Sequence, residues 1–126
     1  MQDKVILVME DEIPLQKAIK IKFEKSGFQV VTARKVTQAL GLLKDLEKID
    51  AIWLDHYLLG KEDGLDFVTK IKTSKKWKNI PVFVVSNTAS PDKIKSYIKL
   101  GVEKYYTKSN YRLDQIIIDI KKNLNK

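Results

Sequence analysis

Five short apolar runs, separated by segments of helical periodicity, are the feature that most constrains the fold of this chain. The first run, Lys4–Met9, is rich in β-branched and aliphatic residues, which is typical of a strand buried on both faces. A stretch of amphipathic helical spacing follows each run. This alternation predicts βαβ units, and hence a mainly parallel sheet with helices on both faces. The other four runs are Phe28–Ala33, Ala51–Leu54, Ile80–Val85 and Val102–Thr107.

Start and stop signals mark the helical segments. Pro14 suits the first turn of a helix, and Gly27 suits its end. Thr37 is a candidate cap for the second helix, and Ser90 opens the fourth. We therefore expect five helices, the last with the clearest core stripe: Leu113, Ile116, Ile117, Ile120 and Leu124.

Composition limits the classes of protein to which this chain can belong. Its 126 residues predict one domain, residues 1–126. It has no cysteine, which excludes disulfides and thiolate metal sites, and a single histidine, His56. No apolar run approaches the length of a membrane span and no signal peptide is evident, so we expect a cytoplasmic protein. The net charge of +8 is compatible with binding to nucleic acid, which is therefore one candidate partner.

Polar side chains follow four of the five predicted strands. The carboxyl ends of parallel strands meet at one edge of a sheet, and ligands bind there in open α/β folds. In a flavodoxin-like, doubly wound order 2-1-3-4-5, the groups after the first, third, fourth and fifth strands would converge on one pocket. The second strand ends in Ala33 and Arg34, with no matching group. The converging groups are Glu10, Asp11, Glu12, Asp55, Ser86 and Lys108.

This set of groups suggests phosphoryl transfer to a carboxylate. Carboxylates held together repel one another and call for a cation, and oxygen ligands without histidine or cysteine suit Mg²⁺. Asp55 would be the nucleophile, while the metal and Lys108 would neutralise charge on the phosphoryl oxygens. Taken singly, each group has an ordinary explanation as a turn, cap or solvated residue, so only their combined placement points to a site.

The segments that carry these residues make the chain similar to the receiver domain of response regulators in two-component signalling, in particular to stand-alone receivers of the chemotaxis-regulator type. The similarity covers nearly the whole chain. Each segment is moderately specific, but all four occur in order and at the spacing of the family. They are VILVMEDE (Val5–Glu12), AIWLDHYLLGKEDGLDFV (Ala51–Val68), IPVFVVSNTAS (Ile80–Ser90) and LGVEKYYTKSN (Leu100–Asn110).

The resemblance implies a metal site and a phosphorylation site. Glu10 and Asp11 would bind Mg²⁺ together with Asp55, the phosphoryl acceptor. The main-chain carbonyl of Tyr57 would be a further ligand of the metal. A histidine kinase or histidine phosphotransfer protein would supply the phosphoryl group.

The resemblance also implies a switch. Ser86 would contact the phosphoryl group and Lys108 would pair with it. Movement of Ser86 would let the ring of Tyr105 turn inward, which changes the surface formed by the fourth helix, fifth strand and fifth helix. A downstream target protein would read that surface. The protein would then be a switch and not an enzyme, catalysing only its own phosphorylation and dephosphorylation.

Several positions depart from the family pattern. Ser109 stands where proline often forms a cis bond, so we expect a different loop geometry or a trans bond there. Leu59 also stands where proline is common. Asn87 replaces a small residue, and either narrows access to Asp55 or adds a hydrogen bond. His56 is expected to be a loop residue.

Three alternative functions compete with a stand-alone receiver. The chain could be a receiver excised from a larger DNA-binding regulator. A basic nucleic-acid-binding module would suit its lysine groups, but only two arginines are present and no helix-turn-helix is evident. A phosphohydrolase of the haloacid dehalogenase type would need a second acid where Tyr57 stands. The lysines instead surround a locally acidic site, which favours an acidic partner such as a kinase domain.

Overall fold

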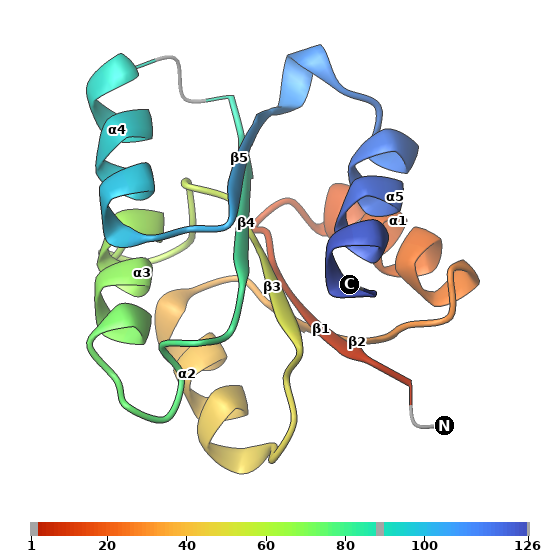
Figure 1. Cartoon of the computed structure of the whole chain (residues 1–126), viewed down its shortest axis with the longest axis horizontal. Helices are drawn as coiled ribbons and strands as arrows, with labels where there is room; N and C mark the ends of the chain where they lie inside the picture. Colours follow the sequence, from red (N-terminus) through yellow and green to blue (C-terminus); the bar gives the residue numbers. More distant parts are fainter. Residues whose placement is uncertain (1–2, 88–89, 126) are drawn as a thin grey trace.

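Five parallel strands form a single sheet in the computed structural model, which describes residues 3–87 and 90–125. The strand order β2-β1-β3-β4-β5 confirms the predicted doubly wound fold (Figure 1). The strands are β1 (Val5–Met9), β2 (Gln29–Ala33), β3 (Ala51–Leu54), β4 (Val82–Ser86) and β5 (Lys104–Thr107).

Five helices cover the two faces of this sheet. They are α1 (Ile13–Lys25), α2 (Val36–Asp45), α3 (Gly64–Lys72), α4 (Pro91–Leu100) and α5 (Leu113–Leu124). Helices α1 and α5 lie on one face, and α2, α3 and α4 lie on the other (Figure 1). Among the described residues, no helix is long and apolar enough to cross a membrane.

Successive side chains along each strand point to opposite faces of the sheet and pack into two separate hydrophobic cores. In β1, Leu7 and Met9 belong to the core under α2, α3 and α4, whereas Ile6 and Val8 belong to the core under α1 and α5. All four side chains are buried. Because both faces of the strand are covered by helices, its sequence is continuously apolar and does not alternate with polar residues.

The sequence located every strand to within two residues, but the predicted cap of α2 was wrong. This helix begins at Val36, after Lys35, so Thr37 lies inside it. Val36 is buried, and it anchors the start of the helix through the core without a side-chain cap. The Ser90 cap of α4 is confirmed, because its side chain accepts the N–H of Lys93.

Candidate functional site

The carboxyl ends of β1, β3, β4 and β5 bring the predicted polar groups to one edge of the sheet. Glu10 directly follows β1, and Asp55 directly follows β3. Ser86 is the last residue of β4, and Lys108 begins a short 3₁₀ turn, η1 (Lys108–Asn110), after β5. Glu10, Asp55 and Ser86 are all buried. Burying polar groups costs free energy unless they have partners, so their gathering at this edge of the sheet points to a functional site.

The Lys108 ammonium bridges two of the carboxylates. Its Nζ donates to Glu10 Oε1 at 2.8 Å and to Asp55 Oδ2 at 3.1 Å. Burial lowers the pKa of Lys108, but the hydrogen bond to Glu10 and the charge of Asp55 outweigh it, so the pKa is raised overall. Lys108 therefore stays protonated and supplies positive charge to both carboxylates.

Glu10 is the carboxylate whose titration is most perturbed. Burial disfavours its charged form, and the neighbouring charge of Asp55 acts in the same direction. The pKa of Glu10 is raised to about 7, even though the hydrogen bond from Lys108 opposes this shift. One ammonium thus does not fully compensate these carboxylates, and a second cation would favour the ionised form of Glu10.

Asp11 completes a group of three carboxylates. Oxygen atoms of Glu10, Asp11 and Asp55 lie within 4.8 Å of one another. Asp11 is half-buried and the other two are buried, so the group faces solvent on one side. Mg²⁺ prefers such hard oxygen ligands and keeps several waters. The donor chemistry and the spacing of the three carboxylates therefore fit the predicted metal.

Tyr105 lies close to the same pocket, half-buried on β5. Burial and the charge of Asp55 raise the pKa of Tyr105, while a side-chain hydrogen bond with Ser86 lowers it. Tyr105 is therefore linked to the residue on which the predicted switch depends. Tyr57, in contrast, is exposed, and its N–H lies 3.4 Å from Asp55 Oδ1.

Both positions where the receiver family often has proline use their backbone N–H in this chain. The N–H of Leu59 donates to the carbonyl of Arg34 at 2.9 Å, and the N–H of Ser109 donates to Asn87 Oδ1 at 2.9 Å. Proline has no N–H and could make neither bond. The Lys108–Ser109 bond is trans, as are the other peptide bonds of the described residues. Of the two effects expected of Asn87, the structure shows the hydrogen bond.

His56 lies in a loop, as expected, but it is also buried, which its sequence context did not reveal. Its Nδ1 is 2.6 Å from the hydroxyl of Tyr97 in α4, and its Nε2 is 3.8 Å from Asp63 Oδ2. Burial lowers the pKa of His56, so the ring is neutral at pH 7. The residue after the candidate phosphoacceptor is thus tied to α4 and to the start of α3.

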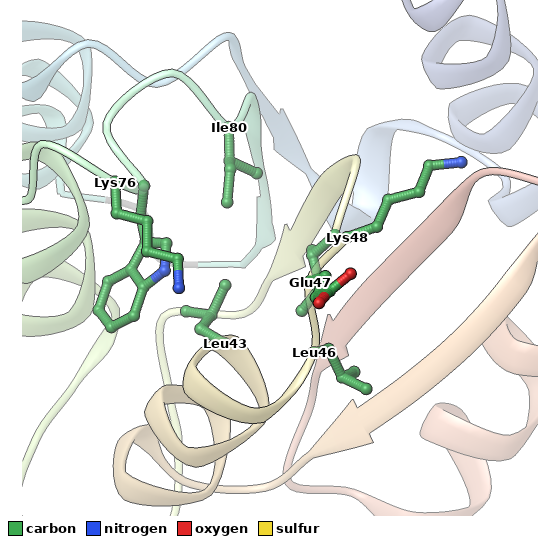
Figure 2. Close-up of a pocket in the computed structure, with 8 residues that line it drawn as sticks. Leu43, Leu46, Glu47, Lys48, Lys76 and Ile80 are labelled. Atoms are coloured by element: carbon green, nitrogen blue, oxygen red, sulfur yellow. The ribbon is translucent and has the colours of Figure 1, made fainter.

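A separate hollow of about 210 Å³ opens at the opposite edge of the sheet. Leu43 at the end of α2 and Ile80 before β4 line it, together with residues of the segment before β3 (Figure 2). None of the three clustered carboxylates lines this hollow. The candidate site is therefore the carboxyl edge, where the charged groups meet.

Comparisons with known proteins agree with this geometry. The family model described as the response regulator receiver domain matches residues 6–121. The chain is 28% identical, over 86% of its length, to the phosphate regulon transcriptional regulatory protein PhoB of Pseudomonas aeruginosa, and covers 46% of that protein. It is 30% identical, over 93% of its length, to a putative NtrX-like response regulator of Rickettsia typhi, and covers 24% of it. The chain thus spans less than half of the length of these relatives.

Two solved structures share the fold of this chain, and the first of them also has the higher sequence identity to it. The phosphorylated cyanobacterial phytochrome response regulator RcpA is 29% identical, with a TM-score of 0.82 over 97% of this chain and 91% of that chain. A response regulator receiver protein from Pseudomonas putida has a TM-score of 0.88 at 20% identity, over 97% of this chain and 98% of that chain, and shows the fold alone. The family match contains the acidic turn after β1, the end of β3 and the lysine after β5. The chain belongs to the family of response regulator receiver domains.

Proposed function

We propose that this receiver domain takes a phosphoryl group from a histidine kinase or a histidine phosphotransfer protein onto Asp55. The observation that carries the proposal is the ion pair of the buried Asp55 with Lys108, beside the carboxylates of Glu10 and Asp11. Phosphoryl transfer to a carboxylate needs an oxygen nucleophile and positive charge near the phosphoryl oxygens. This edge of the sheet supplies the nucleophile, Asp55, and one positive charge, that of Lys108. Its carboxylates could also bind a metal cation, which would supply further positive charge.

In the proposed step, a carboxylate oxygen of Asp55 attacks phosphorus. The P–N bond of the donor phosphohistidine breaks as the O–P bond of the acyl phosphate forms, and the electron pair stays on the donor imidazole. The Lys108 ammonium and the Ser86 hydroxyl donate hydrogen bonds to phosphoryl oxygens. Attack by water on phosphorus later returns Asp55 and inorganic phosphate. The chain would therefore catalyse only its own phosphorylation and dephosphorylation.

Glu10, Asp11 and Asp55, with the main-chain carbonyl of Tyr57, are the proposed ligands of Mg²⁺. When bound, the cation would supply charge neutralisation at the phosphoryl oxygens. Glu10 would be ionised as a ligand, because the charge of the cation would offset the burial and the repulsion by Asp55 that raise its pKa in the free chain. Lys108 would then exchange its bond with Glu10 for one with the phosphoryl group.

We further propose that the face formed by α4, β5 and α5 reports phosphorylation to a downstream target protein. Ser86 would turn to the phosphoryl group and release its hydrogen bond with Tyr105. Tyr105 also lines a hollow of about 620 Å³ on this face, so a change in its position alters the surface. Two exposed apolar side chains, Ile98 and Tyr111, line the same hollow and would be available to a partner.

The proposed receiver domain covers residues 1–126, of which residues 1–2, 88–89 and 126 lie outside the described residues. We place it in the cytoplasm, with its kinase. A second candidate is the receiver part of a longer transcriptional regulator. The observation that favours it is the relative PhoB, which is named as a transcriptional regulatory protein and of which this chain covers 46%.

Intact-mass spectrometry tests the proposed function. After incubation with acetyl phosphate and Mg²⁺, we expect one added phosphoryl group, which is lost without Mg²⁺ and in Asp55→Asn. Glu12→Gln is the matched control. The sequence predicts that Glu12 converges on the pocket, but it is exposed and is not one of the three clustered carboxylates, so this variant should keep the adduct. No adduct with any phosphodonor, or an adduct that persists in Asp55→Asn, contradicts the proposal. A salt-sensitive mobility shift with random DNA that is unaffected by Asp55→Asn would favour a nucleic-acid-binding function.

A further inference from the structure

Arg34, just after β2, contacts both loops that carry the candidate metal ligands. Its Nε and Nη2 donate to the carbonyl oxygen of Asp11 at 3.0 and 2.8 Å. Its own carbonyl accepts the N–H of Leu59 at 2.9 Å. The sequence predicts no group after the second strand that matches the converging carboxylates, hydroxyl and lysine. Arg34 adds a contact of another kind there, because it hydrogen-bonds to backbone atoms of the neighbouring loops.

The sheet order explains how the end of β2 reaches both loops. Strand β1 lies between β2 and β3, and it ends at Met9. Beyond that point Lys35 forms a parallel bridge with Leu59, in the loop after β3. This loop therefore crosses the end of β1 to meet the segment after β2. The acidic turn that follows β1 lies where the two segments meet.

We propose that Arg34 is a positioning residue of the Mg²⁺ site, an inference that rests on the proposed function. Two N–H groups on one carbonyl oxygen fix the peptide plane that follows Asp11, and with it the Cα atom from which the Asp11 carboxylate extends. Gln16 supports the same turn, because its Nε2 donates to the carbonyl of Glu10 at 3.0 Å. Arg34 and Gln16 thus hold the turn by its carbonyl groups and do not occupy the Asp11 carboxylate, which is a proposed ligand of the cation.

Arg34 also contacts the loop after β3, through its main-chain carbonyl. It holds Leu59 four residues after Asp55, in the loop that also contains Tyr57. One residue therefore connects the turn that carries Asp11 to the loop that follows Asp55, in addition to the direct bond from the Asp55 N–H to the carbonyl of Met9 at 3.0 Å. Mg²⁺ demands near-ideal octahedral geometry, so its affinity depends on the spacing between Asp11 and Asp55.

Charge alone would give Arg34 the opposite effect. A guanidinium beside the carboxylates repels a divalent cation, so removing it would strengthen Mg²⁺ binding if Arg34 acted only through its charge. If Arg34 acts by position, removing it weakens Mg²⁺ binding. The sign of the change in affinity therefore separates the two effects.

Isothermal titration calorimetry of the full chain with MgCl₂ at pH 8 measures this sign. We expect Arg34→Met to weaken Mg²⁺ binding about tenfold, as is typical when a residue that orients a metal ligand is removed. Arg34→Lys should weaken it less, because an ammonium keeps the charge but cannot reproduce the forked donor pair. Lys35→Met is the matched control: it removes an exposed positive charge next to Arg34 and should leave Mg²⁺ binding unchanged or slightly tighter.

Each outcome decides one question. Unchanged or tighter Mg²⁺ binding by folded Arg34→Met overturns the positioning role and leaves the proposed function intact. If the unaltered chain binds no Mg²⁺, the proposed metal site fails, and the role of Arg34 fails with it. Thermal unfolding without Mg²⁺ shows whether each variant folds. Should Arg34→Met not fold, Arg34→Lys decides by the same criterion, because unchanged binding there overturns the role of the forked pair.

Discussion

At the scale of single residues, the carboxyl edge of the sheet holds charged groups that depend on one another. Lys108 reaches one oxygen of Glu10 and one of Asp55, and it is the shared partner of both. Glu10 is 1% exposed and still carries an ionisable carboxyl, so its protonation is sensitive to any added cation. The protonation of Glu10 as a function of pH therefore depends on the charges of Lys108 and Asp55 and on any bound cation.

We predict that Mg²⁺ affinity falls about tenfold as the pH is lowered from 8 to 6, because a proton and the cation compete for Glu10. Burial raises the pKa of Glu10 to about 7, which sets this pH range. Calorimetric titration at each pH measures the change. The pH dependence should flatten in Glu10→Gln, and an unaltered dependence in that variant would contradict the role given to Glu10.

The protonation of Glu10 should also affect the stability of the metal-free chain. Lowering the pH is expected to weaken Mg²⁺ binding but to raise the contribution of Glu10 to the free energy of unfolding. The folded-state pKa of Glu10 lies above its ordinary value of 4.5, so lowering the pH from 8 towards 5 favours the folded chain. The lowered pKa of His56 acts against this, since its burial disfavours a proton. The difference in urea unfolding between the unaltered chain and Glu10→Gln isolates the contribution of Glu10.

At the scale of elements, α3 and α4 are attached to the loop after β3 through one close approach. Gly64 begins α3, and its N–H donates to the carbonyl of His56 at 3.0 Å. The hydroxyl of Tyr97, in α4, lies against Gly64 and hydrogen-bonds with the His56 ring. No side chain fits between these groups, so a glycine is required here for space and not for its backbone angles.

We predict that Gly64→Ala lowers the free energy of unfolding by about 2 kcal/mol or more. Its Cβ would meet the Tyr97 hydroxyl, the Cα of His56 at 3.1 Å and the carbonyl oxygen of Asp55 at 3.3 Å. Urea unfolding measures the loss. Gly41→Ala in α2 is the matched control, because nothing lies within 4 Å of its Cβ and alanine favours a helix.

Adding Tyr97→Phe to Gly64→Ala removes the nearest of the three atoms that the added Cβ would meet. The double variant should therefore lose less stability than the two single variants together. Strictly additive losses would show that the Tyr97 hydroxyl is not part of the obstruction.

Strands and helices were predictable because their apolar periods are local properties of the sequence. The turns were not. The start of α2 depends on the burial of Val36 and not on the hydroxyl of Thr37. The link from His56 to Tyr97 joins residues that are 41 positions apart, and no local pattern in the sequence pairs them. The Arg34 guanidinium donates to the main-chain carbonyl of Asp11. Every residue has such a carbonyl, so no pattern of side chains in the sequence could reveal this contact.

At the scale of the whole molecule, a net charge of +8 surrounds an acidic pocket. Exposed lysines on α1 include Lys17 and Lys25, and Lys121 and Lys122 are exposed on the neighbouring α5. The basic exterior favours encounters with an acidic partner, while the pocket itself favours a divalent cation. The candidate site residues could be predicted together because the sheet order brings the ends of four strands to one edge.

Borohydride trapping followed by peptide mapping tests the central claim most directly. Borohydride reduces an acyl phosphate to an alcohol, so a phosphorylated aspartate is recovered as homoserine. After incubation with acetyl phosphate and Mg²⁺, we predict homoserine at position 55 and unmodified carboxyl groups at Glu10 and Asp11. A reduced side chain at Glu10 or Asp11, or none at Asp55 while an adduct is present, would contradict the account.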